Sequence, residues 1–89
     1  MSASFRDPSA AGARVVVVGA GGNIGSQLVP HLARLPQIGS LVLIDRGVYD
    51  LGNVATQAIT RRDAGRQKAE VQADLVRRIN PGLFATPVA

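Results

Sequence analysis

Residues 15–26 read VVVVGAGGNIGS, a run of four valines followed by a glycine-rich stretch. Consecutive β-branched residues that end at a glycine are typical of a strand buried on both faces of a parallel sheet. Apolar residues then recur at intervals of three and four, which predicts a helix from about Asn23 to Leu35. The expected apolar face of this helix consists of Ile24, Leu28, Leu32 and Leu35. The chain therefore opens its domain with a strand, a glycine-rich turn and a helix.

The same alternation continues to the end of the chain. Residues 41–44 form a second apolar run, which predicts a strand that ends at Asp45. Asp63 is expected to cap a second helix, which the turn sequence at residues 80–82 terminates before a third strand within residues 83–88. The apolar positions of the second helix are Val71, Leu75 and Ile79. We therefore predict the α/β class, as a Rossmann-like half with the order β-α-β-α-β and a parallel sheet.

This topology is expected to leave one face of the sheet uncovered. Parallel crossover connections are right-handed, so three strands that step in one direction place both helices on the same face. The first strand of a doubly wound sheet normally pairs on both sides, and the predicted elements include no outer neighbour for it. We therefore expect a homodimer partner or a carboxyl-terminal half of a longer protein to complete the sheet, and we favour the second.

Length and composition narrow the class of protein. The chain has 89 residues, enough for one small domain, and 46% of them are hydrophobic. Residues 1–13 lack periodicity and are expected to form a flexible arm, so that the domain spans residues 14–89. The absence of cysteine excludes disulfides, thiolate zinc sites and a cysteine nucleophile.

Hydropathy and charge also narrow the choice of partners. No apolar run approaches the roughly 20 residues that span a bilayer, and the first residues have no signal-peptide core. We therefore expect a cytoplasmic protein with no membrane partner. The net charge of +4 comes mostly from arginines scattered along the chain, without a basic stripe or stacking aromatics. We accordingly expect no nucleic-acid partner.

The segment GAGGNIGS, residues 19–26, stands between the first predicted strand and helix, where a phosphate-binding loop belongs. Glycines let the backbone approach an anion, and the free N–H groups at the helix start point toward it. Asp45 follows Gly25 by twenty residues and ends the second strand, where a carboxylate can accept hydrogen bonds from ribose hydroxyls. The glycine spacing differs from the usual dinucleotide pattern, so the choice among ADP-containing ligands stays open. The candidate nucleotide-binding residues of this region are Gly19, Gly21, Gly22, Asn23, Gly25 and Asp45.

Four segments in series match one known family. The first two are VVVVGAGGNIGSQLVPHLARL at residues 15–35 and LVLIDRG at residues 41–47. Asn53 and Gln57 fall where an N-x-x-R-Q motif places its Asn and Gln, and GRQKAEVQADLVRRINPGL at residues 65–83 matches a G-x-x-K helix that ends in I-N-P. Together they resemble the ThiF family, the ubiquitin-activating-enzyme-like adenylyltransferases, over about residues 14–83.

This resemblance implies a reaction and a set of roles. Members use ATP and Mg²⁺ to adenylate the carboxy-terminal glycine of a ubiquitin-like or sulfur-carrier protein, with release of pyrophosphate. In this chain Gly21, Gly22 and Gly25 would face the nucleotide and Asp45 its ribose. Asn53, with Gln57 of the same motif, would border the phosphate region, and Lys68 would contact the triphosphate as the candidate catalytic residue. Positioned N–H groups, a lysine and a metal suit this chemistry because they stabilise charge on phosphate oxygens.

The chain also departs from the family pattern. Thr56 stands where the motif has its arginine, and Gly47 replaces a second acidic residue after Asp45. Arg61 and Arg62 are interpreted as solvated surface charges rather than as substitutes for the missing arginine. Arg66, in the first turn of the second predicted helix, is interpreted as a side chain that reaches water rather than one that serves a ligand. The family's metal-binding aspartate and its zinc cysteines have no counterpart in the sequence, so no metal-ligating residue is assigned and the 89 residues alone are not expected to be active.

Two other functions remain open from the sequence. An NAD(P)-binding oxidoreductase domain would share the glycine loop and the ribose carboxylate, but it gives no reason for the pattern from Asn53 to Lys68. A non-catalytic module that keeps the fold for protein interaction would account for Thr56. Nucleotide preference separates the first alternative from an adenylyltransferase, and pyrophosphate exchange separates the second.

Overall fold

The computed structural model describes residues 12–55, 57 and 59–89. Strands and helices alternate along the chain in the predicted order, with two short 3-10 helices inserted before the second α-helix. The elements are β1 (Ala13–Val18), α1 (Asn23–Ala33), β2 (Ile38–Ile44), η3 (Leu51–Ala55), η4 (Arg61–Asp63), α2 (Lys68–Ile79) and β3 (Phe84–Val88). This order confirms the α/β class.

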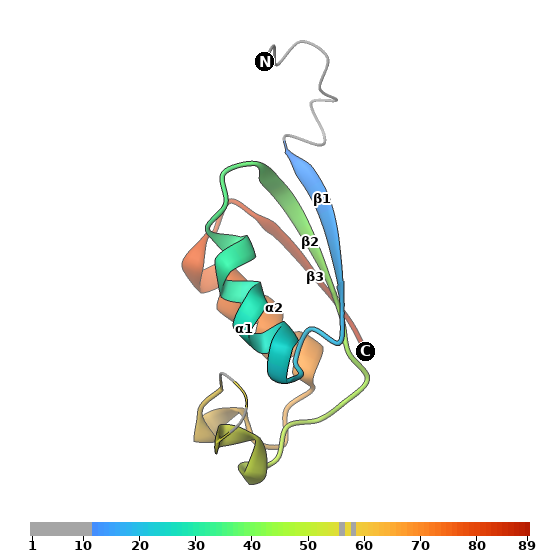
Figure 1. Cartoon of the computed structure of the whole chain (residues 1–89), viewed down its shortest axis with the longest axis vertical. Helices are drawn as coiled ribbons and strands as arrows, with labels where there is room; N and C mark the ends of the chain where they lie inside the picture. Colours follow the sequence, from blue (N-terminus) through green and yellow to red (C-terminus); the bar gives the residue numbers. More distant parts are fainter. Residues whose placement is uncertain (1–11, 56, 58) are drawn as a thin grey trace.

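The three strands form one parallel sheet in the order β1-β2-β3. Val17 pairs with Leu43 of β2, which in turn pairs with Pro87 of β3. Figure 1 shows α1 and α2 together on one side of the sheet, as right-handed crossovers between strands that step in one direction require. The chain is therefore a partial Rossmann-like sheet, and β1 is an edge strand as expected.

Strand side chains alternate between a covered and an uncovered face. Val17, Leu41 and Leu43 point into the core between the sheet and the two helices, where all three are buried. Val16 and Val18, one position out of phase, are 55% and 79% exposed on the opposite face. The continuous valine run is therefore compatible with two covered faces, but in this structure only one of them is covered.

Helix α1 is rotated away from the predicted apolar face, of which Leu32 alone packs, partly buried, against the core. Ile24 and Leu28 of the predicted apolar face are 82% and 43% exposed, whereas Val29 and Ala33 are fully buried. Both faces show the same i, i+4 spacing, so spacing alone does not choose between them. The side chains on the Val29 and Ala33 face are small and allow α1 to approach the sheet and α2 closely, which decides which face is buried. The helix also ends at Ala33, two residues before Leu35.

The start of helix α2 also corrects the prediction. Asp63 does not cap this helix but closes the capping box of η4 with Thr60, and α2 begins five residues later with Gln67 as its N-cap. Of the predicted apolar positions only Val71 is fully buried, while Leu75 and Ile79 are half-buried. The residues of α2 with buried side chains are Ala69, Val71, Gln72, Ala73 and Val76.

The first and last strands lie near the two ends of the described chain. Strand β1 begins at Ala13, which is the last residue of the expected arm. Strand β3 begins at Phe84, one residue after Leu83. The rest of the expected arm, residues 1–11, lies outside the described residues. No helix within the described ranges has the length and apolar character to cross a bilayer.

Candidate nucleotide-binding site

The glycine-rich loop is fastened to the carboxyl end of β2. Gly19 has a φ of +73°, a conformation that favours glycine, and it turns the chain directly after β1. The backbone N–H groups of Gly19 and Ala20 donate to the carbonyl of Ile44 at 2.8 and 3.1 Å. A Cβ on Gly25 would lie 2.2 Å from the Gly19 oxygen, so only glycine lets the first turn of α1 approach the loop this closely. The loop therefore places the start of α1 at the edge where the strands end.

The start of α1 presents unpaired backbone donors. Gly22 is the N-cap and supplies no side-chain hydrogen bond, and no acidic residue lies in the first turn. Within the described part of the chain the N–H groups of Asn23, Ile24 and Gly25 have no hydrogen-bond partner. Free donors and the positive end of the helix dipole make this helix start a favourable place for an anion such as a phosphate.

Asp45 is held against the glycine loop by two backbone hydrogen bonds. Gly21 N–H donates to its Oδ2 at 3.1 Å, and Gly47 N–H donates to its Oδ1 at 2.8 Å. These bonds fix the carboxylate at the end of β2 and leave each oxygen with further acceptor capacity. The structure thus brings the predicted ribose-binding carboxylate next to the predicted phosphate loop.

Lys68 reaches the same place from the first position of α2. Its backbone N–H donates to the Gly47 carbonyl at 2.9 Å. A Cβ on Gly21 would meet Lys68 Cβ at 2.4 Å, and a Cβ on Gly47 would meet Lys68 Cδ at 2.9 Å. The lysine stem therefore packs in space that these two glycines leave free. Gly47, where the family pattern has an acidic residue, makes room for this path.

Tyr49 connects the parts of the site and was not predicted from the sequence. Its side chain is 1% exposed, its hydroxyl donates to the Gly21 carbonyl at 2.6 Å, and Gln72 Nε2 donates to that hydroxyl at 2.9 Å. Lys68 Nζ lies 5.3 Å from the centre of the tyrosine ring, within cation–π range. Burial, together with the negative charges of Asp45 and Asp63, raises the pKa of Tyr49 to about 12, although the Gln72 hydrogen bond lowers it. Tyr49 therefore stays protonated and ties the glycine loop to α2.

No periodic pattern marked Tyr49 or Gln72, because both act through long-range contacts. One feature of the sequence could have pointed to Tyr49: it is an aromatic residue in an irregular segment, and only 3% of the chain is aromatic. Gln72 Oε1 is buried and has no partner in the described part of the chain. The other end of the same amide, Gln72 Nε2, donates to the Tyr49 hydroxyl.

Asn53 and Gln57 form a local unit that is not bonded to the loop. Asp50 N–H donates to Asn53 Oδ1 at 2.9 Å, and Gln57 N–H donates to the Asn53 carbonyl at 2.8 Å. Among the described residues no hydrogen bond joins either residue to the glycine loop or to Asp45. Gln57 Oε1 is buried without a partner, and Thr56 lies outside the described residues.

Comparison with known proteins agrees with this geometry. A family model described as "ThiF family" matches residues 9–89. The chain belongs to the ThiF family. The match includes the glycine loop, Asp45 and Lys68, the three features that meet at the edge of the sheet.

Relatives of this ThiF-family chain carry different activities in their names. The "SAMP-activating enzyme E1" of Haloferax volcanii is 41% identical over 76 residues, covering 84% of this chain and 27% of the relative. The "tRNA threonylcarbamoyladenosine dehydratase" of Escherichia coli is 42% identical over 79 residues, covering 88% of this chain and 29% of the relative. A "Hydroxysteroid 11-beta-dehydrogenase 1-like protein" of Danio rerio is 43% identical over 67 residues, covering 74% of this chain and 21% of the relative.

The structural comparison covers the same portion of these proteins. The E. coli dehydratase solved in complex with ATP has a TM-score of 0.80 and 39% identity to this ThiF-family chain, covering 88% of this chain and 32% of the other. The chain thus spans less than a third of the length of the relatives it matches. Nucleotide binding is therefore seen in a solved structure with the same local fold.

Proposed function

We propose that the chain is the ATP-binding portion of a ThiF-type adenylyltransferase that activates the carboxy-terminal carboxylate of a ubiquitin-like or sulfur-carrier protein. The supporting observation is that Gly21 and Gly47 bond Asp45 while leaving space for Lys68, so that loop, carboxylate and lysine meet. An NAD(P) site would need the loop and the carboxylate but not the lysine. We propose a cytoplasmic location for this activity, as expected from the sequence.

The proposed roles follow from the geometry of each group. Phosphate oxygens would accept hydrogen bonds from the free N–H groups of residues 23–25, with Gly19, Gly21 and Gly22 shaping the loop beside them. The two carboxylate oxygens of Asp45 would accept hydrogen bonds from the ribose hydroxyls, since each oxygen can accept more than its one backbone bond. Lys68 would turn from the Tyr49 ring toward the triphosphate. Asn53 and Gln57 would border the phosphate region, where the buried Gln57 Oε1 still lacks a partner.

The proposed step is attack of a carboxylate oxygen of the carrier on the α-phosphorus of ATP. The bond from that phosphorus to the bridging oxygen breaks, and pyrophosphate leaves with the electron pair while the acyl-adenylate forms. Backbone N–H groups and Lys68 would stabilise the charge on the phosphate oxygens, because positioned donors in a fixed site need no reorganisation. Mg²⁺ would supply further neutralisation when bound to the phosphates. One or two carboxylates usually hold Mg²⁺ beside phosphates, and the family's metal-binding aspartate has no counterpart among the 89 residues, so we propose that its protein ligand lies elsewhere.

Replacement of Lys68 by methionine tests the proposal. Methionine keeps an unbranched stem against Gly21 and Gly47 but removes the charge, so thermal stability should change little while ATP affinity falls about tenfold or more. Nucleotide binding is measured by calorimetry and adenylation by carrier-dependent exchange of pyrophosphate into ATP, both in the intact protein, since the 89 residues alone are not expected to be active. Lys68→Arg is the matched control that retains the charge and should recover part of the affinity.

The same assays separate the alternatives. Preferential NAD binding would contradict the proposal and favour the oxidoreductase alternative, which the likeness to the dehydrogenase-like relative supports. ATP binding by the intact protein without exchange for any carrier would favour a non-catalytic module. Exchange that depends on tRNA instead of a carrier protein would assign the substrate class that the E. coli relative carries in its name.

A further inference from the structure

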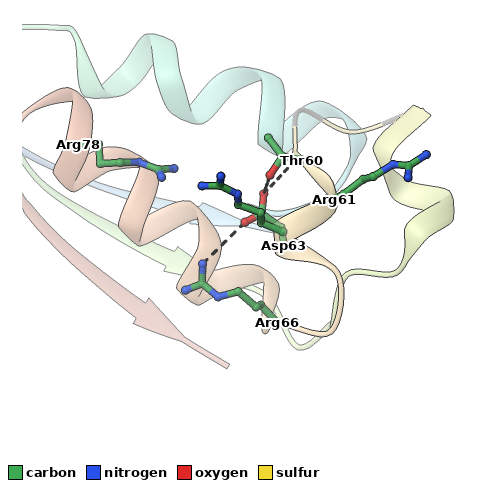
Figure 2. A pocket seen from close by; sticks show the side chains of 6 residues that line it. Thr60, Arg61, Asp63, Arg66 and Arg78 are labelled. Atoms are coloured by element: carbon green, nitrogen blue, oxygen red, sulfur yellow. Dashed lines mark hydrogen bonds and ion pairs between the residues drawn. The ribbon is translucent and has the colours of Figure 1, made fainter.

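A cavity of about 410 Å³ lies between η4 and the outer side of α2. Figure 2 shows the side chains that line it. None of these side chains belongs to the glycine loop, and neither Asp45 nor Lys68 is among them, so the cavity is separate from the candidate nucleotide site. The lining residues are Thr60, Arg61, Arg62, Asp63, Arg66 and Arg78.

The charges around this cavity are strongly unbalanced, with four arginines and one aspartate. Arg66 is the arginine with carboxylate partners, since it pairs with Asp63 at 3.7 Å and with Asp74 of α2. Its pKa is raised above the ordinary arginine value by the Asp74 hydrogen bond. The side chains of the other three arginines, Arg61, Arg62 and Arg78, have neither an ion pair nor a hydrogen bond to any described residue. Like charges gathered at one cavity repel one another unless an anion lies between them.

Hydrogen bonds and ion pairs fix the turn at one side of the cavity and join it to α2. Thr60 N–H donates to Asp63 Oδ2 at 2.9 Å, and Asp63 N–H donates to the Thr60 carbonyl at 3.0 Å, which closes the turn that carries Arg61 and Arg62. Arg66 then links η4 to α2 through its two aspartate partners. In Figure 2, Arg66 and Arg78 reach toward Asp63, whereas Arg61 extends away from them. A fixed turn lowers the backbone entropy that binding costs.

We propose that this cavity binds adjacent phosphate groups of an anionic ligand. A phosphate carries more charge than a carboxylate and offers several acceptor oxygens in the geometry that a guanidinium fork matches, so neighbouring phosphates can engage several arginines at once. The lining contains no aromatic side chain, so a nucleobase has no surface on which to stack and the contact is made through phosphates alone. Such phosphates come from an inorganic polyphosphate or from the backbone of a nucleic acid.

Calorimetric titration of the full chain with inorganic tripolyphosphate at low salt tests this site. The double variant Arg62→Gln, Arg78→Gln should bind about tenfold more weakly or worse, because it removes two unpaired charged donors. Both side chains are exposed, so the variant should keep its circular dichroism spectrum. The matched control is Arg14→Gln, Arg34→Gln, which loses the same charge at exposed positions outside the cavity and should bind as the parent does.

Two further experiments separate this cavity from the nucleotide site and identify the source of the phosphates. Lys68→Met should retain the tripolyphosphate binding that depends on Arg62 and Arg78, since that cavity is separate from the nucleotide site. Competition by a short single-stranded RNA would assign the phosphates to a nucleic-acid backbone, and its failure would assign them to free polyphosphate. The proposal is overturned by equal weakening in the control pair, by loss of all binding in Lys68→Met, or by the absence of saturable binding in the parent chain.

Discussion

Tyr49 is the one tyrosine of the chain, which also has no tryptophan. Its hydroxyl lies between the Gly21 carbonyl and Gln72, and its ring lies under Lys68. A single buried residue thus joins the glycine loop, the segment after β2 and helix α2. Because its ionised form would be buried near Asp45 and Asp63, the folded state favours the protonated phenol. The spectroscopic signal of tyrosine ionisation in this protein therefore comes from Tyr49 alone.

Titration of tyrosinate absorbance should show a midpoint at about pH 12 in the folded chain and about 10 in denaturant. Since folding raises this pKa, the stability that it contributes is complete below about pH 10 and is lost as the pH rises toward 12. Urea denaturation across this range measures the loss. Tyr49→Phe serves as the control, because this variant lacks the phenol but keeps every lysine and arginine. The difference between the two proteins is therefore the contribution of the Tyr49 hydroxyl. A folded-state midpoint near 10 would contradict the buried hydrogen-bonded phenol.

At the scale of elements, α1 shows how packing chooses between two faces of one helix. Ile24 and Leu28 form an apolar line of the predicted kind, but α1 directs Val29 and Ala33 against the sheet and α2. Small side chains at the contact let the helix approach closely, and the larger ones stay at the surface. The same preference places Ala69 and Ala73 of α2 in the core instead of Leu75.

Alanine replacements on the two faces of α1 measure this difference. Val29→Ala removes buried methyl groups and should lower the free energy of unfolding by about 1–3 kcal/mol. Ile24→Ala, at a side chain that is 82% exposed, should change it by less than about 0.5 kcal/mol. Both changes replace a β-branched residue in the same helix, so their effects on helix propensity are matched. A larger loss at Ile24 would support the face predicted from the sequence.

At the scale of the whole molecule, one face of the sheet carries both helices and the other carries none (Figure 1). Apolar side chains line the uncovered face across neighbouring strands, because Val18 pairs with Ile44 and Ile44 with Val88. Val18 and Phe84 are 79% and 73% exposed there. Contiguous apolar surface on a sheet with an open edge strand favours association with other chains.

The chain should therefore bind a hydrophobic dye such as ANS and associate as its concentration rises. Val18→Lys places a charge on the uncovered face of the edge strand and should reduce both effects without loss of helicity. Light scattering and dye fluorescence measure the two changes. Val17→Lys is the contrasting control, since its side chain faces the core and the variant should unfold. Unchanged association in Val18→Lys would show that this face does not drive it.

Local patterns in the sequence determined the order of the elements and the glycine loop. They also placed Asp45 at the end of the second strand and Lys68 at the start of the second helix. These features depend on neighbours within a few residues, where β-branched runs, helical periodicity and glycine act directly. Asp63 was misplaced because its carboxylate serves the short turn with Thr60 instead of the longer helix that follows.

Only the tertiary structure decided which helix faces are buried, that Tyr49 ties the site together, and that arginines from η4 and α2 share one cavity. Tyr49 and Gly21 are 28 positions apart in sequence, and Arg62 and Arg78 are 16 apart, so no local pattern relates them. Their relations come from the packing of helices on a sheet, which depends on shape complementarity between distant segments. Local chemistry therefore sets what each segment can become, and long-range packing sets which side chains meet.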